Sequence, residues 1–103
     1  MKLIFFNFLF LFSLAAAAEN IVNATRVWPA PDYTRVTIES SSAIYNDQMM
    51  LQNPERIVVD LKDIELNDAL KQLSSQVDSL DPNIKEIRVA QFNPKVTRLV
   101  IDL

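Results

Sequence analysis

Residues 53–61 read NPERIVVDL, and residues 93–103 read NPKVTRLVIDL. In both stretches an Asn-Pro pair precedes an arginine, and the arginine opens an apolar run that contains one aspartate. An earlier stretch, PDYTRVTIE at residues 31–39, follows the same order of proline, arginine, apolar residues and acid. Proline favours a turn, and the β-branched residues after it favour a strand. The repeated phrase therefore predicts three turns, each leading into an equivalent β-strand.

Alternation along each phrase predicts which side of its strand is buried. Successive side chains of a strand point to opposite faces of the sheet, so apolar residues two apart share one face. In the second phrase Ile57, Val59 and Leu61 form such a set, whereas Arg56 and Asp60 lie on the other face. The other phrases repeat this alternation with Val36 and Ile38, and with Leu99, Ile101 and Leu103. Further strands are expected within residues 26–28, 44–51 and 87–92, which makes the fold mainly β and antiparallel.

One segment has the spacing of a helix instead. Its apolar residues recur every three or four positions, as on one face of an amphipathic helix: Leu66, Leu70, Leu73, Val77 and Leu80. Asn67 stands at the expected N-cap, and Pro82 follows the expected end. We expect one amphipathic helix that packs across a sheet and joins the first two phrases to the last.

The first eighteen residues have the layout of a secretory signal peptide. Lys2 gives a positive start, residues 3–14 are almost entirely apolar, and residues 15–18 are alanines that suit signal peptidase. A membrane anchor is the alternative, but the apolar run is shorter than the roughly 20 residues that a spanning helix needs. We predict cleavage between Ala18 and Glu19, a periplasmic location and no stable membrane insertion after cleavage.

The remaining residues, 19–103, are enough for a single domain. The chain has 13 acidic and 10 basic residues, and this net negative charge argues against nucleic acid as a partner. It contains no cysteine, so no disulfide supports its small core. The sequence stops inside its third patterned strand, which leads us to expect a domain truncated at its C-terminal end.

The composition leaves little for catalysis. Histidine, cysteine and glycine are absent, which removes thiol nucleophiles, histidine-assisted serines, histidine-bearing zinc sites and glycine-rich phosphate loops. Asp60 and Asp102 could form an acid pair of the kind that glycosidases use. Each, however, lies four residues after an arginine on the same strand face, where pairing with a cross-strand arginine is the commoner role. We therefore expect neither catalytic nor metal-binding residues in this chain.

Three arginines open the three equivalent strands: Arg35, Arg56 and Arg98. If these strands share a sheet, the arginines form a row of guanidinium groups that can bind carboxylates through two hydrogen bonds each. The alternative is salt bridging within the sheet, to the acids Glu39, Asp60 and Asp102.

Aromatic residues flank the first predicted turn. Trp28 and Tyr33 bracket residues 29–32 and can either stack on sugar rings or cover a small core. Phe92 precedes the last turn, where we favour the role of core cover, and we expect the Met-Met-Leu cluster at residues 49–51 to fill the core. The candidate ligand-binding residues are thus the three arginines together with Trp28 and Tyr33.

Three stretches closely resemble the AMIN domain, the N-terminal module of periplasmic N-acetylmuramoyl-L-alanine amidases: RVWPAPDYTRVTIES (26–40), LQNPERIVVDLKDIEL (51–66) and VTRLVIDL (96–103). The resemblance covers nearly all of residues 24–103, and NPERIVVDL is its most specific part. It implies two small packed antiparallel sheets related by internal pseudo-symmetry, with each phrase supplying an equivalent strand. It also implies that the domain continues for further strands beyond residue 103.

By this resemblance the chain is a non-catalytic module that binds peptidoglycan and targets an amidase to the division septum. Divisome or other envelope proteins would be additional partners. The zinc-dependent catalytic domain that follows such modules has no counterpart here, so neither zinc nor hydrolysis is assigned to this chain. A related AMIN module occurs in the secretins of type IV pilus machines. An interaction or cell-wall anchoring module of such a secretin is the alternative function.

Overall fold

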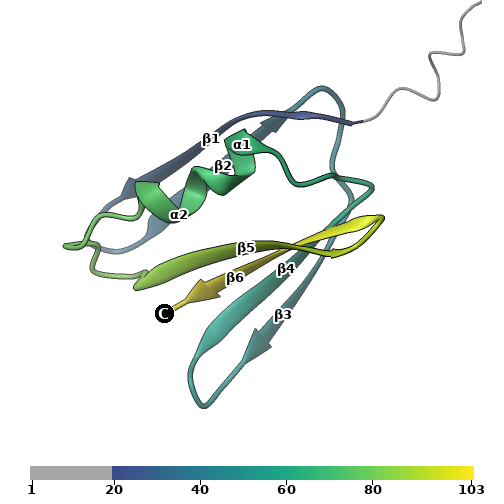
Figure 1. Cartoon of the computed structure of the whole chain (residues 1–103). Helices are drawn as coiled ribbons and strands as arrows, with labels where there is room; N and C mark the ends of the chain where they lie inside the picture. The colour runs from purple at the N-terminus through teal and green to yellow at the C-terminus, as the bar shows by residue number, and fades with distance from the viewer. Residues whose placement is uncertain (1–19) are drawn as a thin grey trace, which may run out of the picture.

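The computed structural model describes residues 20–103, so the predicted signal peptide at residues 1–18 lies outside the described residues. Six strands form two antiparallel sheets, which confirms the predicted mainly-β class (Figure 1). One sheet pairs β1 with β2, and the other has the strand order β3-β4-β6-β5. The strands are β1 (Val22–Pro29), β2 (Thr34–Ser40), β3 (Asn46–Leu51), β4 (Arg56–Lys62), β5 (Glu86–Asn93) and β6 (Val96–Asp102).

Each repeated phrase forms the second strand of a β-hairpin: β2, β4 and β6 pair with β1, β3 and β5. The chain contains no glycine, and the residues with positive φ within 20–103 are Asn53 (61°) and Asp63 (56°). Asparagine and aspartate tolerate this conformation better than other residues that carry a Cβ. Asn53, from the repeated Asn-Pro pair, therefore takes in the β3–β4 turn the role that glycine has in many hairpins.

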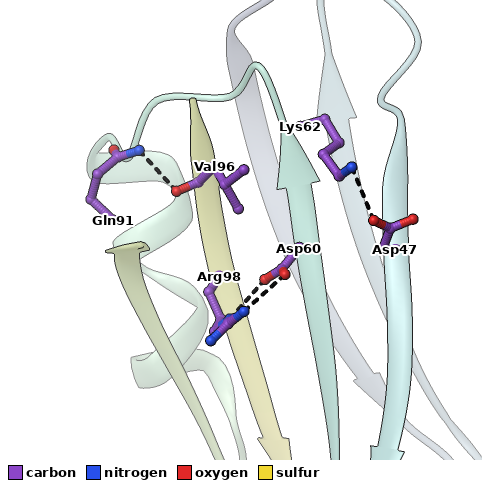
Figure 2. Close-up of polar contacts among 6 residues, drawn as sticks. All are labelled: Asp47, Asp60, Lys62, Gln91, Val96 and Arg98. Atoms are coloured by element: carbon purple, nitrogen blue, oxygen red, sulfur yellow. Dashed lines mark hydrogen bonds and ion pairs between the residues drawn. The ribbon is translucent and has the colours of Figure 1, made fainter. Parts of the chain in front are cut away.

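Two of the three phrases lie side by side, because β4 pairs with β6. The antiparallel register places Arg56 opposite Asp102 and Asp60 opposite Arg98. Both phrases read arginine, three apolar residues, aspartate, so this arrangement sets each arginine against the acid of the other copy. Figure 2 shows one such pair, in which Arg98 Nε and Nη2 donate to the two carboxylate oxygens of Asp60 at 2.8 and 3.0 Å. The repetition thus favours one register as well as one type of strand.

The inner faces of the two sheets enclose the core, as the alternation predicted. Leu61, Leu99 and Ile101 turn inward from the four-stranded sheet and are buried. The remaining members of the buried cluster come from β1, β5, the helical segment and its flanking loops: Val22, Ile64, Leu70, Leu73, Ile84 and Ile87. Val58 lies on the outer face yet is buried, since Met49 and Val100 flank it on the two neighbouring strands.

The helical segment consists of two successive turns, α1 (Asp68–Lys71) and α2 (Leu73–Gln76). Leu70 and Leu73 are fully buried, which confirms the predicted apolar face at these positions. Asn67 is the predicted N-cap, and its Oδ1 accepts a hydrogen bond from Leu70 N at 3.0 Å. The capping side chain satisfies one of the amides that a helix leaves unpaired at its start.

The helix ends at Gln76, so the expectation that Leu80 lies on its buried face is wrong. Leu80 is 85% exposed. Val77 is already extended, and the Asp78 side chain accepts a hydrogen bond from Leu80 N at 2.8 Å. An aspartate that binds an amide two residues further on competes with helical hydrogen bonding. The apolar spacing therefore continues beyond the helix itself.

Threonine hydroxyls tie the helical segment to β1 and the loop before it to β6. α1 and α2 contact β1, and α2 also contacts β5 (Figure 1). Thr25 Oγ1 on β1 donates to Ala69 O in α1 at 2.6 Å, and Thr97 Oγ1 on β6 donates to Ile64 O at 2.7 Å. Both threonines are buried, so their hydroxyls need these partners and the carbonyls need these donors.

The methionines of β3 do not fill the core. Met49 and Met50 are 55% and 54% exposed, so the prediction for residues 49–51 is wrong at these two positions. The reason is that β3 is an edge strand packed mainly against β4, whereas β5 at the opposite edge is also covered by α2. Side chains on either face of such a strand have fewer neighbours to cover them.

β2 is also an edge strand, since among residues 20–103 it pairs with β1 alone. An open groove of about 500 Å³ lies between β2 and the inner face of the four-stranded sheet, and its apolar lining includes Val36, Ile38, Ile57, Val59 and Leu103. The expectation that the domain continues beyond residue 103 stays a prediction.

Thr97→Val is expected to destabilise the fold by about 1–3 kcal/mol. The change removes the hydroxyl donor to Ile64 O at almost constant side-chain volume, and it leaves that buried carbonyl oxygen without its partner. Urea unfolding should show a lower midpoint with an unchanged m-value.

Thr37→Val is the matched control, because Thr37 lies on the outer face of β2 and is part-exposed. Its free energy of unfolding should change by less than about 0.5 kcal/mol. Equal stability of the two variants would contradict a tethering role for the Thr97 hydroxyl.

Candidate functional site

The outer face of the β1–β2 hairpin carries a shallow basin of about 410 Å³. Five residues line it, and we call it the β1–β2 basin: Arg26, Trp28, Tyr33, Arg35 and Thr37. Its composition follows from strand alternation, because the residues between these positions on each strand turn toward the core. Trp28 lies directly opposite Arg35, and Arg26 lies directly opposite Thr37.

The two arginines of the basin have no acidic partner within the described chain. The ion pairs among residues 20–103 join Lys62 to Asp47, Arg88 to Asp102 and Arg98 to Asp60. Arg26 and Arg35 take part in none of them, and both are exposed. Their guanidinium groups can therefore donate hydrogen bonds to a ligand.

The aromatic side chains of the basin are also accessible. Trp28 is 62% exposed and Tyr33 is 57% exposed, so the alternative that these rings only cover the core does not fit their positions. Exposed aromatic rings offer flat surfaces for stacking on sugar rings. A face that combines such rings with unpaired guanidinium groups suits a ligand with apolar ring faces and negative charge.

A clamp from a distant loop holds the turn that carries these rings. Within the turn, Ala30 N donates to Tyr33 O at 2.8 Å. Asn83 Nδ2 donates to Ala30 O at 2.9 Å, and Thr34 Oγ1 donates to Asp81 Oδ1 at 2.8 Å. The segment between the helix and β5 thus fixes both ends of the turn. Tyr33 and Trp28 lie at those ends, so the clamp also fixes their backbone.

Asp81 is the centre of the clamp. Its Oδ1 accepts hydrogen bonds from the backbone amides of Asn83 and Ile84 at 2.8 and 3.0 Å, in addition to the one from Thr34. Burial, the largest single influence, favours the neutral acid, but these three hydrogen bonds together outweigh it. They hold the pKa of the Asp81 carboxyl below its ordinary value of 3.8.

The other two predicted arginines lie on the four-stranded sheet, apart from the basin. Arg98 is bound to Asp60, and its Cζ lies 3.8 Å from the centre of the Phe92 ring. This hydrogen bonding lowers the pKa of Asp60. Arg56 Nη1 donates to the backbone carbonyl of Pro54 at 2.7 Å. The guanidinium group of Arg98 is therefore paired within the domain, and that of Arg56 is bound to the hairpin loop that precedes β4.

Arg35, Arg56 and Arg98 do not form the expected row. Arg35 belongs to the other sheet, and antiparallel pairing puts Arg56 and Arg98 at opposite ends of β4 and β6. The alternative of salt bridging is confirmed for Arg98 with Asp60. Asp102 is paired as well, but with Arg88, whose Nε and Nη2 donate to it at 3.0 Å each. Neither aspartate is then arranged as a free catalytic acid.

Arg26 is the basin residue that the sequence analysis did not select. A signal for it exists: the tripeptide Thr-Arg-Val occurs at residues 25–27 and again at 34–36. On two strands of one hairpin, such a repeat places two arginines on the same outer face, provided that the register has the right parity. The pairing of Arg26 with Thr37 and of Arg35 with Trp28 meets that condition.

Within residues 20–103, no group of three or more histidine, cysteine, aspartate or glutamate side chains is placed to hold a metal ion. In the same part of the chain, no helix is long and apolar enough to cross a membrane.

The fold and the basin together define a small β domain with a basic and aromatic outer face on its two-stranded sheet. The chain belongs to the AMIN domain family, whose sequence model matches residues 24–103. This membership confirms the resemblance carried by the repeated phrases.

Two curated relatives are similar over most of the chain. It is 50% identical over 91 residues to the N-acetylmuramoyl-L-alanine amidase AmiC of Escherichia coli O6:H1, a match that covers 88% of this chain and 21% of that protein. It is 45% identical over 80 residues to the N-acetylmuramoyl-L-alanine amidase AmiC of Neisseria meningitidis serogroup B, covering 78% of this chain and 19% of that protein. The chain thus spans about a fifth of the length of these relatives.

Asp81→Asn should weaken the clamp in a pH-dependent way. Because the folded state lowers the pKa of Asp81, its carboxylate stabilises the fold fully above the ordinary pKa value of 3.8. That stabilisation is lost as the pH falls through the folded pKa. At pH 7 the variant should therefore be less stable than the wild type by about 1 kcal/mol, because its neutral amide accepts weaker hydrogen bonds. The difference should shrink as the pH is lowered below 4.

Urea melts over a pH series measure this difference, and Trp28, the single tryptophan of the chain, reports on the clamped turn by its fluorescence. Asp32→Asn is the control, because Asp32 lies in the same turn but is exposed. A stability difference between Asp81→Asn and the wild type that is the same at every pH would contradict the assignment.

Proposed function

We propose that this AMIN domain is a non-catalytic module that binds peptidoglycan and carries an attached N-acetylmuramoyl-L-alanine amidase to the division septum of the periplasm. The observation that carries the proposal is the β1–β2 basin, where accessible rings lie beside guanidinium groups without acidic partners. Peptidoglycan offers both matching features, since its glycan strands have ring faces and its stem peptides have carboxylates.

Family membership and the two relatives support an amidase context. Both relatives carry the name N-acetylmuramoyl-L-alanine amidase, which favours an amidase module over the alternative of a pilus-secretin module. In this proposal hydrolysis belongs to a separate zinc-dependent domain. The absence of histidine and cysteine from the whole chain is consistent with that division of roles.

A co-sedimentation assay on purified sacculi tests the proposal by comparing two aromatic residues of the basin with a tyrosine outside it. Tyr33→Ala and Trp28→Ala should each lower the affinity of the purified chain for sacculi by about five- to thirty-fold. This loss is typical of an anchoring aromatic residue at a binding surface. Tyr45→Ala is the matched control: Tyr45 is 76% exposed but lies outside the basin, so its replacement should leave binding unchanged.

Arg56→Gln distinguishes the two outer faces. It should leave pelleting unchanged if the basin is the binding face. If Arg56→Gln weakened binding while Trp28→Ala did not, the ligand would lie on the four-stranded sheet and the basin would lose its role. If the folded wild-type chain failed to pellet with sacculi at all, the proposal of peptidoglycan binding itself would be wrong.

A further inference from the structure

We propose that the β1–β2 basin selects free carboxylate groups, so that its ligand is peptidoglycan with unamidated acidic groups rather than the neutral parts of the polymer. This inference rests on the proposed function and goes further by naming the chemical group that is recognised. It depends on a difference between the two sheets in whether their arginines have acidic partners.

On the four-stranded sheet, Arg88 and Arg98 pair with acids of the same sheet, whereas Arg56 donates to the backbone carbonyl of Pro54. Arg98 donates two hydrogen bonds to Asp60, and Arg88 donates two to Asp102. In both pairs the planar guanidinium group meets a carboxylate through two nitrogen atoms. These pairs show how this protein places an arginine whose role is structural.

On the two-stranded sheet, neither Arg26 nor Arg35 forms an ion pair with an acid of residues 20–103. Arg26 and Arg35 are diagonal neighbours on the two strands, because Arg26 lies opposite Thr37 and Arg35 lies two residues before Thr37. Such diagonal neighbours are close enough for long side chains to interact, and like charges there repel each other. Glu39 follows further along the outer face of β2, yet it forms no ion pair within residues 20–103.

The charge of the whole chain sharpens this contrast. Its net charge is −3, so the guanidinium groups of Arg26 and Arg35 form a local positive site on a chain that is acidic as a whole. An anion bound between Arg26 and Arg35 would relieve a local repulsion and accept hydrogen bonds from two guanidinium groups. The rings of Trp28 and Tyr33 border this position in the same basin.

A carboxylate fits these donors better than an amide does. A carboxylate has two charged acceptor oxygens that match the guanidinium fork, whereas an amide has one neutral acceptor oxygen and a donor nitrogen that faces the donors of arginine. Converting the recognised carboxylate to an amide should therefore weaken binding by about ten- to a hundred-fold.

The experiment compares sacculi before and after amidation of their carboxylates with carbodiimide and ammonia. The purified wild-type chain should bind amidated sacculi about ten- to a hundred-fold more weakly than mock-treated sacculi. Arg26→Gln and Arg35→Gln should bind mock-treated sacculi weakly and should be affected much less by amidation. Lys71→Gln is the control, since Lys71 is exposed on α1 outside the basin, and it should respond to amidation as the wild type does.

A third preparation, glycan strands stripped of their stem peptides, separates the two sources of carboxylate. Loss of binding to these strands assigns the recognised group to the stem peptide. Retained binding that amidation abolishes assigns it to the lactyl group of muramic acid. Equal binding of the wild type to amidated and mock-treated sacculi would overturn the inference while leaving peptidoglycan binding intact. No binding to any preparation would overturn the proposed function instead.

Discussion

The antiparallel pairing of β4 with β6 is the contact on which the rest of the structure depends. These strands are copies of one phrase, and their register sets Arg98 against Asp60 across the sheet. A shift by one residue would separate that pair and turn Leu61 and Leu99 from the core to solvent. β3 and β5 then add to the outer sides of this central pair, which completes the larger sheet.

Hydrogen bonds from a few polar side chains join the smaller sheet to the larger one. Thr25 and Asn67 tie β1 to the helical segment, and Thr97 ties β6 to Ile64 in the loop before that segment. Asp81 and Asn83 then connect the end of that segment to the β1–β2 turn. A chain without cysteine thus links distant segments through buried or part-buried hydrogen bonds, each of which would be costly to leave unmade.

The two outer faces of the domain differ more than the repeated phrases suggest. On the face of the larger sheet, Arg88 and Arg98 pair with aspartates and Lys62 pairs with Asp47 at 2.9 Å (Figure 2), while Arg56 is bound to the backbone carbonyl of Pro54. The face of the smaller sheet keeps two arginines unanswered between exposed rings. The repeated phrases thus supply a strand to the smaller sheet and two strands to the larger one, whereas the side chains give the two sheets different chemistry. This asymmetry is the basis of the proposal that the β1–β2 face binds the ligand.

The sequence by itself determined the strands, their buried sides and the helix start. Proline and β-branched residues locate β2, β4 and β6, and the Asn67 cap acts over three residues only. These are local signals, so they can be read without knowing the fold. Trp28 and Tyr33 could be selected in the same way, because they flank one turn.

Tertiary structure alone decided which arginines are free. Whether Arg35, Arg56 or Arg98 has an acidic partner depends on which strands become neighbours, and residues far apart in sequence set that arrangement. The same is true of Arg26, which joins the basin through the register of β1 with β2. Leu80 and the methionines of β3 followed the apolar pattern yet lie in water, since a local Asp78 turn and an edge position removed their neighbours. Apolar spacing identifies side chains that could be buried. Each is buried only where a second segment covers it, and the tertiary structure determines where that happens.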